Sequence, residues 1–264
     1  MWVMRVDHLR AAHMTPPGFP ALPAHVFVCH SDDGLVLVDT GFGTADVRDP
    51  VRRLGPMRRL LRPVLDEGYT VVRQLEARGL DPADVRHVVL THLDFDHAGG
   101  LSDFPDAVVH TTADEHAAAV TDPDFLDKQR YRPAQWEHGP RFETHAGRGD
   151  EWRFGLTAHE VVPGIALIPM PGHSRGHAAV GVDGDGTTIV HAGDAVFDAS
   201  HVGETAPDGH PLRPLRPVRV FEQVVGRDRR RIVANHRELR RLATLPDVLV
   251  VPAHDARVTG ALVG

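Results

Sequence analysis

The sequence contains a single cysteine, Cys29, among its 264 residues. This excludes an intrachain disulfide and any metal site built from several cysteines. The chain also lacks an apolar run of about 18 residues, so no membrane-spanning helix is expected. The segment 1–8 has no apolar core of signal-peptide length. We therefore expect a cytoplasmic protein that does not associate with membranes.

An excess of basic residues is missing as well. The chain has 29 Lys and Arg against 36 Asp and Glu, and its formal net charge is −7 with neutral histidine. Proteins that bind nucleic acid or anionic membranes usually present a net basic face, so neither partner is expected. Histidine, in contrast, is abundant, with 19 residues. It is the commonest metal ligand and the usual acid or base near neutral pH.

The hydrophobic pattern predicts a layered α/β architecture in one domain over residues 1–264. Strands are expected at 26–29 and 35–39 (a hairpin), 85–91, 107–111, 165–170, 178–182, 187–191 and 248–251, with a turn at 184–186. Helices are expected at 69–78, 113–120 and 221–243. The stretches 42–63 and 198–217 are rich in Pro, Gly and Arg and lack periodicity, which is typical of loops that cover a site.

Four side chains able to bind a metal fall within six residues directly after the predicted strand 85–91. They are His92, Asp94, Asp96 and His97. Residues two apart share one face of an extended segment, so the first three are expected on one side, with His97 turning in where a helix begins. A polar turn with helix-capping aspartates is the alternative explanation.

Four ligands cannot hold two metal ions alone, so a two-metal site needs further ligands downstream. Three later predicted strands each end in small residues and then a ligand-type side chain: His173 after 165–170, Asp194 after 187–191 and His254 after 248–251. Loops at strand ends are where a rigid scaffold presents a site. We expect these side chains to meet the 92–97 segment.

From the run Leu-Val-Leu-Val-Asp-Thr-Gly at 35–41 to His254, five separated motifs resemble those of the metallo-β-lactamase fold hydrolases, nearest to their lactonase and glyoxalase II-like branches. The resemblance implies a four-layer αβ/βα sandwich with a two-metal site at the edge of the sheets. Asp39 is similar to the family's carboxylate that orients ligating imidazoles. By the same resemblance, His92, Asp94 and His173 would hold metal one, Asp96, His97 and His254 would hold metal two, and Asp194 would bridge both.

Two residues depart from the family pattern. Asp94 stands where the family usually has histidine, which makes the first site more anionic. Two divalent ions, zinc by default, are expected, but a carboxylate there favours manganese or iron more than an all-histidine site does. Phe197 stands where lactonases that act on acyl-homoserine lactones often have tyrosine, and it cannot donate a hydrogen bond.

The resemblance implies a binuclear hydrolase in which a metal-bridging hydroxide cleaves an ester, lactone or thioester. Asp96 is the expected catalytic residue, because it can orient the hydroxide and pass on its proton. The substrate is expected to be a small molecule chosen by the segments 42–63, 122–140 and 198–217. The oligomeric state stays open, a homo-oligomer included.

Three alternatives compete with this hypothesis. Gly172-His173-Ser174-Arg175-Gly176 matches a nucleophile elbow, and the order Ser174, Asp194, His254 fits a metal-free serine hydrolase, although it leaves the 92–97 cluster unexplained. Relatives with a carboxylate at position 94 include di-iron redox proteins. A metal-binding protein without catalysis is the third alternative.

The remaining candidates are expected to be structural. His177 and His191 flank ligands and should support them or pack in strands. The seven arginines of 227–241 are expected on the solvated face of an amphipathic helix rather than on an RNA-binding surface. The arginines of 42–63 (Arg52, Arg53, Arg58, Arg59 and Arg62) could attract an anionic substrate, and Phe19, Phe42, Trp136 and Trp152 could line a pocket, but solvation and core packing are the default roles.

Overall fold

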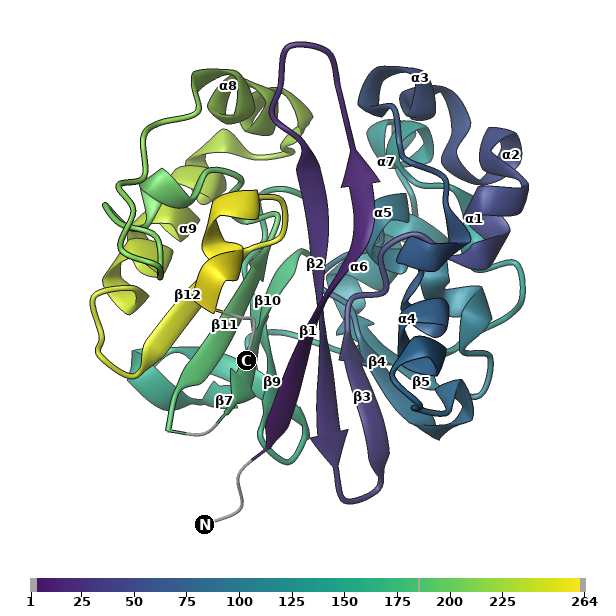
Figure 1. The fold of residues 1–264 in the computed structure, drawn as a ribbon, viewed down its shortest axis with the longest axis horizontal. Coiled ribbons are helices and arrows are strands. Elements are labelled where there is room, and N and C mark those ends of the chain that lie inside the picture. The colour runs from purple at the N-terminus through teal and green to yellow at the C-terminus, as the bar shows by residue number, and fades with distance from the viewer. Residues whose placement is uncertain (1–3, 185, 262–264) are drawn as a thin grey trace.

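Two six-stranded mixed sheets form the centre of the molecule, and helices cover the outer face of each (Figure 1). The computed structural model describes residues 4–184 and 186–261. The first sheet has the order β1 (Arg5–Met14), β2 (Leu22–Ser31), β3 (Gly34–Val38), β4 (Val85–Val89), β5 (Val108–Thr112), β6 (Arg141–His145). The second has the order β12 (Val248–Pro252), β11 (Thr188–Gly193), β10 (Ala178–Asp183), β9 (Ile165–Pro169), β8 (Thr157–Val162), β7 (Asp150–Glu151).

The helices divide between the two outer layers in chain order (Figure 1). Over the first sheet lie α1 (Thr44–Arg48), α2 (Pro50–Leu54), α3 (Arg58–Leu61), α4 (Val71–Ala77), α5 (Phe95–Ala98), α6 (Ala113–His116) and α7 (Phe125–Arg130). Over the second lie α8 (Arg216–Val225) and α9 (Arg229–Leu242). The predicted four-layer αβ/βα sandwich is therefore confirmed.

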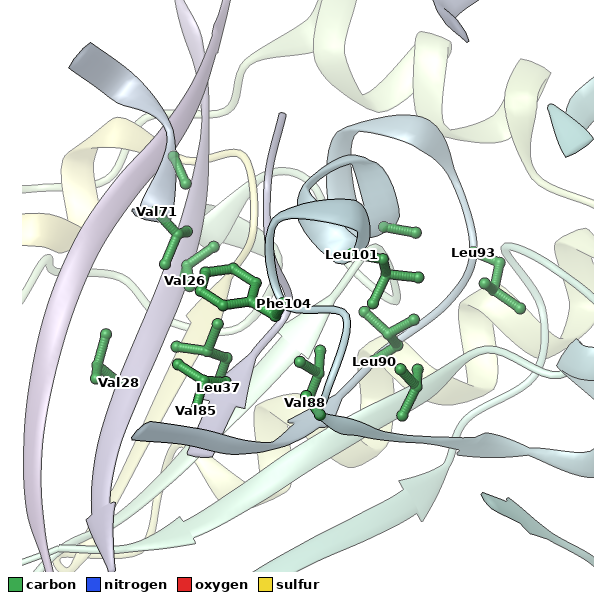
Figure 2. Close-up of a cluster of buried hydrophobic side chains, with 14 of the residues drawn as sticks. Val26, Val28, Leu37, Val71, Val85, Val88, Leu90, Leu93, Leu101 and Phe104 are labelled. Atoms are coloured by element: carbon green, nitrogen blue, oxygen red, sulfur yellow. The ribbon is translucent and has the colours of Figure 1, made fainter. Parts of the chain in front are cut away.

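Side chains alternate between two cores along the strands, as the pleat of a strand requires. In β3, Val36 and Val38 face the second sheet, where they pack with Ile165 and Leu167. Leu37 faces the other way, into the core beneath the helices of the first layer (Figure 2). Central strands buried on both faces explain why they read as continuous apolar runs.

The eight predicted strands are present, with shifted ends, but the helix predicted over 221–243 is wrong. It is two helices, α8 and α9, separated at 226–228. The carboxylate of Asp228 accepts the N–H groups of Arg230 and Arg231 and so starts a new helix. A side chain at Gly226 would meet Ile232 Cδ1 at 2.3 Å, so glycine allows the two helices to approach closely.

Other differences concern segments without a strong apolar period. The predicted loop 42–63 contains α1, α2 and α3, and the predicted helix 113–120 is α-helical only as far as His116, after which Ala117–Thr121 forms a π turn. Strands β1, β6, β7 and β8 were not predicted. Two predictions fall partly outside the described residues: the turn at 184–186, which includes Asp185, and the absence of a signal peptide in 1–8, which includes residues 1–3.

The seven arginines of 227–241 are exposed, while Ile232, Leu239 and Leu242 on α9 are buried. This confirms the amphipathic interpretation of that segment. Within residues 4–184 and 186–261, α9 is the longest helix with 14 residues, and a bilayer crossing takes about 20; no described helix is long and apolar enough to cross a membrane.

Candidate metal centre

Four strand ends meet at one edge of the sandwich and bring the seven predicted ligands together. The 92–97 segment follows β4 and enters α5, with Asp94 directly before its first residue. The loops after β9, β11 and β12 supply the rest. Two groups of side chains have their ligand atoms within 4.8 Å of one another: a first group of His92, Asp94, His173 and Asp194, and a second group of Asp96, His97 and His254.

In the first group, two imidazoles face two carboxylates. His173 Nε2 lies 3.3 Å from Asp94 Oδ2 and 3.1 Å from Asp194 Oδ2. His92 Nε2 lies 3.3 Å from Asp94 Oδ2 and 3.8 Å from Asp194 Oδ2. One oxygen of each carboxylate thus points between the two rings.

The second group repeats this arrangement around the other oxygen of Asp194. His254 Nε2 lies 3.0 Å from Asp194 Oδ1 and 3.4 Å from Asp96 Oδ2. His97 Nε2 lies 3.4 Å from Asp194 Oδ1 and 3.3 Å from His254 Nε2. Asp194 therefore presents Oδ2 to the first group and Oδ1 to the second.

Hydrogen bonds on the outer side of the His97 and His254 rings direct the inner nitrogens of these two residues toward the ligand group. His97 Nδ1 donates to Asp39 Oδ2 at 2.8 Å, and His254 Nδ1 donates to the Pro23 carbonyl at 2.6 Å. Asp39 is buried with a left-handed φ of 59° and also contacts His191 Nε2 at 3.1 Å. A proton fixed on Nδ1 leaves the Nε2 lone pair for a metal.

His177 supports Asp194 through the backbone. Its Nε2 accepts the N–H of Asp194 at 2.9 Å, and its Nδ1 donates to the Met170 carbonyl at 3.2 Å. With the contact between His191 and Asp39, this places both flanking histidines behind the ligands, as the sequence predicts.

The electrostatics of the site favour positive charge. Burial alone would lower the pKa of His97, but the carboxylates of Asp194 and Asp39 raise it well above its usual value. Burial likewise opposes ionisation of Asp194, yet His254, His173 and His97 hold its pKa well below the usual range. Within the part of the chain that the structure describes, His92 Nε2 and Asp194 Oδ1 are buried without a hydrogen-bond partner. These orphaned atoms and the mixed imidazole and carboxylate donors fit divalent cations.

Arg130, at the end of α7, was missed by the sequence analysis. Its Nε and Nη2 donate to the two oxygens of Asp94 at 2.7 and 2.6 Å. Nη1 donates to the carbonyls of His173 and Val225, and Nη2 also contacts His173 Nε2. All five N–H groups are engaged, so the guanidinium cancels the charge of Asp94. The only sequence signal for Arg130 was the unusual Asp94. A buried carboxylate needs a cationic partner, but the sequence does not identify that partner.

Glu115, from α6, is a second missed residue. It is buried, and its carboxylate accepts the N–H of Leu93, the hydroxyl of Tyr131 and the hydroxyl of Ser174, the last at 2.5 Å. Glu115 therefore joins the 92–97 segment to the loop that carries His173. Because the Ser174 hydroxyl is directed to Glu115, the hydrogen bond from serine to His254 that the triad alternative requires is not made among the described residues.

Five members of the two groups line one side of a cavity of about 460 Å³: Asp94, Asp96, His173, Asp194 and His254. Its walls are mainly apolar and come from β1, β2, the 54–61 region, α7, α8 and the loop after β11. They include Met14, Leu22, Met57, Leu61, Phe95, Leu126, Phe197, Phe221, Val224 and Val225. A volume of this size suits a small organic ligand.

Some predictions about the pocket are corrected by this lining. The stretches 42–63 and 122–140 contribute to it, but 198–217 does not, and α8 takes its place. The default expectation of core packing is confirmed for four aromatic residues that do not line this cavity: Phe19, Phe42, Trp136 and Trp152. Phe42, for example, stacks on Phe95. Arg53 is not a lid residue, because it is buried in an ion pair with Asp46.

Comparison with known proteins gives consistent matches. The sequence model described as the metallo-beta-lactamase superfamily matches residues 20–254. A probable metallo-hydrolase of Mycobacterium tuberculosis is 42% identical over 257 residues, which cover 96% of this chain and 80% of that protein. An N-acyl homoserine lactonase of Bacillus thuringiensis is 26% identical over 205 residues, covering 77% of this chain and 74% of the other.

Among solved structures, an N-acyl homoserine lactone hydrolase with the product N-hexanoyl-L-homoserine at its catalytic metal centre superposes with a TM-score of 0.71. It is 21% identical, with 97% of this chain and 95% of that chain covered. At this identity the likeness establishes the fold.

Proposed function

The chain belongs to the metallo-beta-lactamase superfamily, and on that premise we propose that it is a metal-dependent hydrolase that opens a lactone, or cleaves an ester or thioester, with an apolar acyl group. The observation that carries the proposal is Asp194, whose two oxygens face two separate groups of ligands on the floor of an apolar cavity. Lactonases among its relatives support the lactone assignment.

We propose that His92, Asp94, His173 and Asp194 hold one ion, and that Asp96, His97, His254 and Asp194 hold a second. When bound, two divalent ions lower the pKa of water and polarise a carbonyl oxygen. Zinc is the proposed ion, because Arg130 cancels the charge by which Asp94 would otherwise favour manganese or iron.

Asp96 is the proposed proton carrier. It lines the cavity, and its Oδ2 lies 3.4 Å from His254 Nε2. Burial raises the pKa of Asp96, and the Asp194 and Asp94 carboxylates add to the rise. A carboxylate with a raised pKa can take a proton from the attacking water and return it to the leaving oxygen.

The cavity lining narrows the choice of a group that orients the substrate. Phe197 lies against the rings of His173 and His254 and offers no donor. The lining has two uncharged side-chain donors, and Ser174 is committed to Glu115. Gln129 is therefore the proposed donor to an amide or carbonyl of the substrate.

A substrate panel tests the proposal. We expect turnover of N-acyl homoserine lactones and aryl esters by the zinc-loaded protein, with no turnover of phosphate monoesters. Burying two further methylenes contributes about 1.6 kcal/mol, so kcat/KM should rise about tenfold from the N-butanoyl to the N-hexanoyl lactone. Equal rates along the acyl series, or activity on phosphate monoesters alone, would contradict the proposal.

Replacing Arg130 by methionine should increase the affinity for the ion proposed to bind at His92, Asp94, His173 and Asp194. A unit charge and a divalent ion about 4 Å apart repel by about 8 kcal/mol at an effective dielectric constant of about 20. Loss of a partner that orients a ligand costs about 10- to 100-fold in affinity, or about 1.4–2.8 kcal/mol. Repulsion is the larger effect, so zinc titration against a competing chelator should show at least about tenfold tighter binding at one of the two steps.

The matched control is Arg227→Met, since Arg227 also lines the cavity but pairs with Asp124 and Asp127. Its two zinc steps should stay as in the unaltered protein. Weaker binding in Arg130→Met would mean that the guanidinium orients Asp94 for the metal rather than competing with it.

A further inference from the structure

A second cluster of metal-competent side chains lies behind the cavity wall, between α8, α9 and the turn Ala199–His201. This α8–α9 cluster consists of His201, Glu222 and His236, whose ligand atoms lie within 4.8 Å of one another. Glu222 is fully buried, His236 is 8% exposed and His201 is half-buried. The rings of His201 and His236 are 4.3 Å apart between centroids. It shares no residue with the two groups around Asp194.

The hydrogen bonds of Glu222 are uneven. Its Oε1 accepts the backbone N–H of Phe197 at 2.8 Å and faces His236 Nε2 at 3.1 Å. Its Oε2 is buried and has no hydrogen-bond partner among the described residues, and the same is true of Nδ1 of His201. A buried polar atom without a partner costs about 1–3 kcal/mol, and more when it is charged. Two such atoms in one cluster require an explanation.

Protonation of a histidine does not explain these two unpartnered atoms. A protonated His236 would pair with Glu222 through Oε1 but would leave Oε2 and His201 Nδ1 as they are. Two imidazoles and one carboxylate are, however, a common protein ligand set for zinc. A water would complete the four ligands that zinc usually takes.

We propose that His201, Glu222 and His236 form a third metal site, which takes a single divalent ion of the zinc type. Glu222 binds the ion through Oε2 and keeps Oε1 on the N–H of Phe197. The ion thereby fixes α8, whose Phe221, Val224 and Val225 line the cavity, against the loop after β11. The site is structural and does not depend on the proposed hydrolase activity.

The test counts zinc bound by the metal-depleted protein during titration against a competing chelator, with elemental analysis after desalting. The unaltered chain should bind three equivalents. Glu222→Gln keeps the size of the side chain and an acceptor for Phe197, and should bind two. His210→Gln, a change at an exposed histidine of the neighbouring loop, should still bind three. Equal zinc content in Glu222→Gln and the unaltered chain would overturn the proposal.

Two further variants keep the result interpretable. His201→Ala alters a half-buried side chain at the end of a turn, so it should fold even if Glu222→Gln does not, and it should also lose one equivalent. Asp194→Ala should retain one equivalent of zinc, bound at the third site. The double variant Asp194→Ala with Glu222→Gln should bind none. The two groups around Asp194 are called the paired site. If the unaltered chain binds two equivalents and His201→Ala also binds two, the third site is wrong and the paired site stands. If one equivalent is bound and only His201→Ala removes it, the third site stands and the paired site is wrong.

Discussion

Replacing Asp194 by alanine is expected to release both ions of the paired site and to lower kcat/KM on the best lactone by at least about 10³-fold. The reason is geometric. Asp194 Oδ2 lies 3.1 Å from His173 Nε2 and Oδ1 lies 3.0 Å from His254 Nε2, so one truncation removes a ligand from each group. Elemental analysis and steady-state kinetics measure the two effects.

Asp208→Ala is the control, since Asp208 is an exposed aspartate of the loop before α8. Its metal content and kcat/KM should match those of the unaltered protein. An Asp194→Ala protein that kept both of these ions would refute the bridging role. One that kept the ions and lost only activity would make Asp194 a catalytic group rather than a ligand.

Truncation of Arg53 to alanine is expected to cost about 3–5 kcal/mol in the free energy of unfolding, because it strands a buried charge. Arg53 Nε donates to Asp46 Oδ1 at 2.7 Å, and the two side chains are 3% and 0% exposed. The guanidinium also reaches the carbonyls of Ala134 and Gly99. It therefore ties α2 to the end of α5 and to the segment after α7. Urea denaturation measures the loss.

The neighbouring Arg52 gives a matched comparison. It pairs with Glu137 at 2.6 Å on the surface, where its side chain is 55% exposed. Water and salt screen a surface ion pair, so Arg52→Ala should leave the unfolding free energy nearly unchanged. If the two alanine variants lost similar amounts of unfolding free energy, burial would not be the reason that the ion pair of Arg53 and Asp46 stabilises the protein.

Central strands and the ligands at their ends could be predicted from the sequence because both follow from local rules. A strand buried on both faces reads as a nearly continuous apolar run, as β3 and β9 do. A ligand at a strand end has to follow small residues, as Asp194 follows Ala192 and Gly193. These two patterns can be recognised in the sequence without knowing which elements pack against the strand.

What could not be predicted depends on partners that are distant in sequence. β6 has no buried residue along its length and is held by pairing with β5, so it carries no apolar period. The break between α8 and α9 involves the close approach of Gly226 to Ile232, where a Cβ would clash, together with the Asp228 cap. Arg130 and Glu115 act on residues 36 and 59 positions away, Asp94 and Ser174. The function of such a charge is visible only when the fold shows what it faces.

The paired site also crosses the boundary between the two halves of the chain. His92, Asp94, Asp96 and His97 come from the half that builds the first sheet, and His173, Asp194 and His254 come from the half that builds the second. Two ions bound there, as proposed above, would link the two halves of the chain. Each would add about 2.7 kcal/mol to the free energy of unfolding at a free concentration 100 times its dissociation constant. Removal of these ions with a chelator would therefore lower the free energy of unfolding as well as the proposed activity.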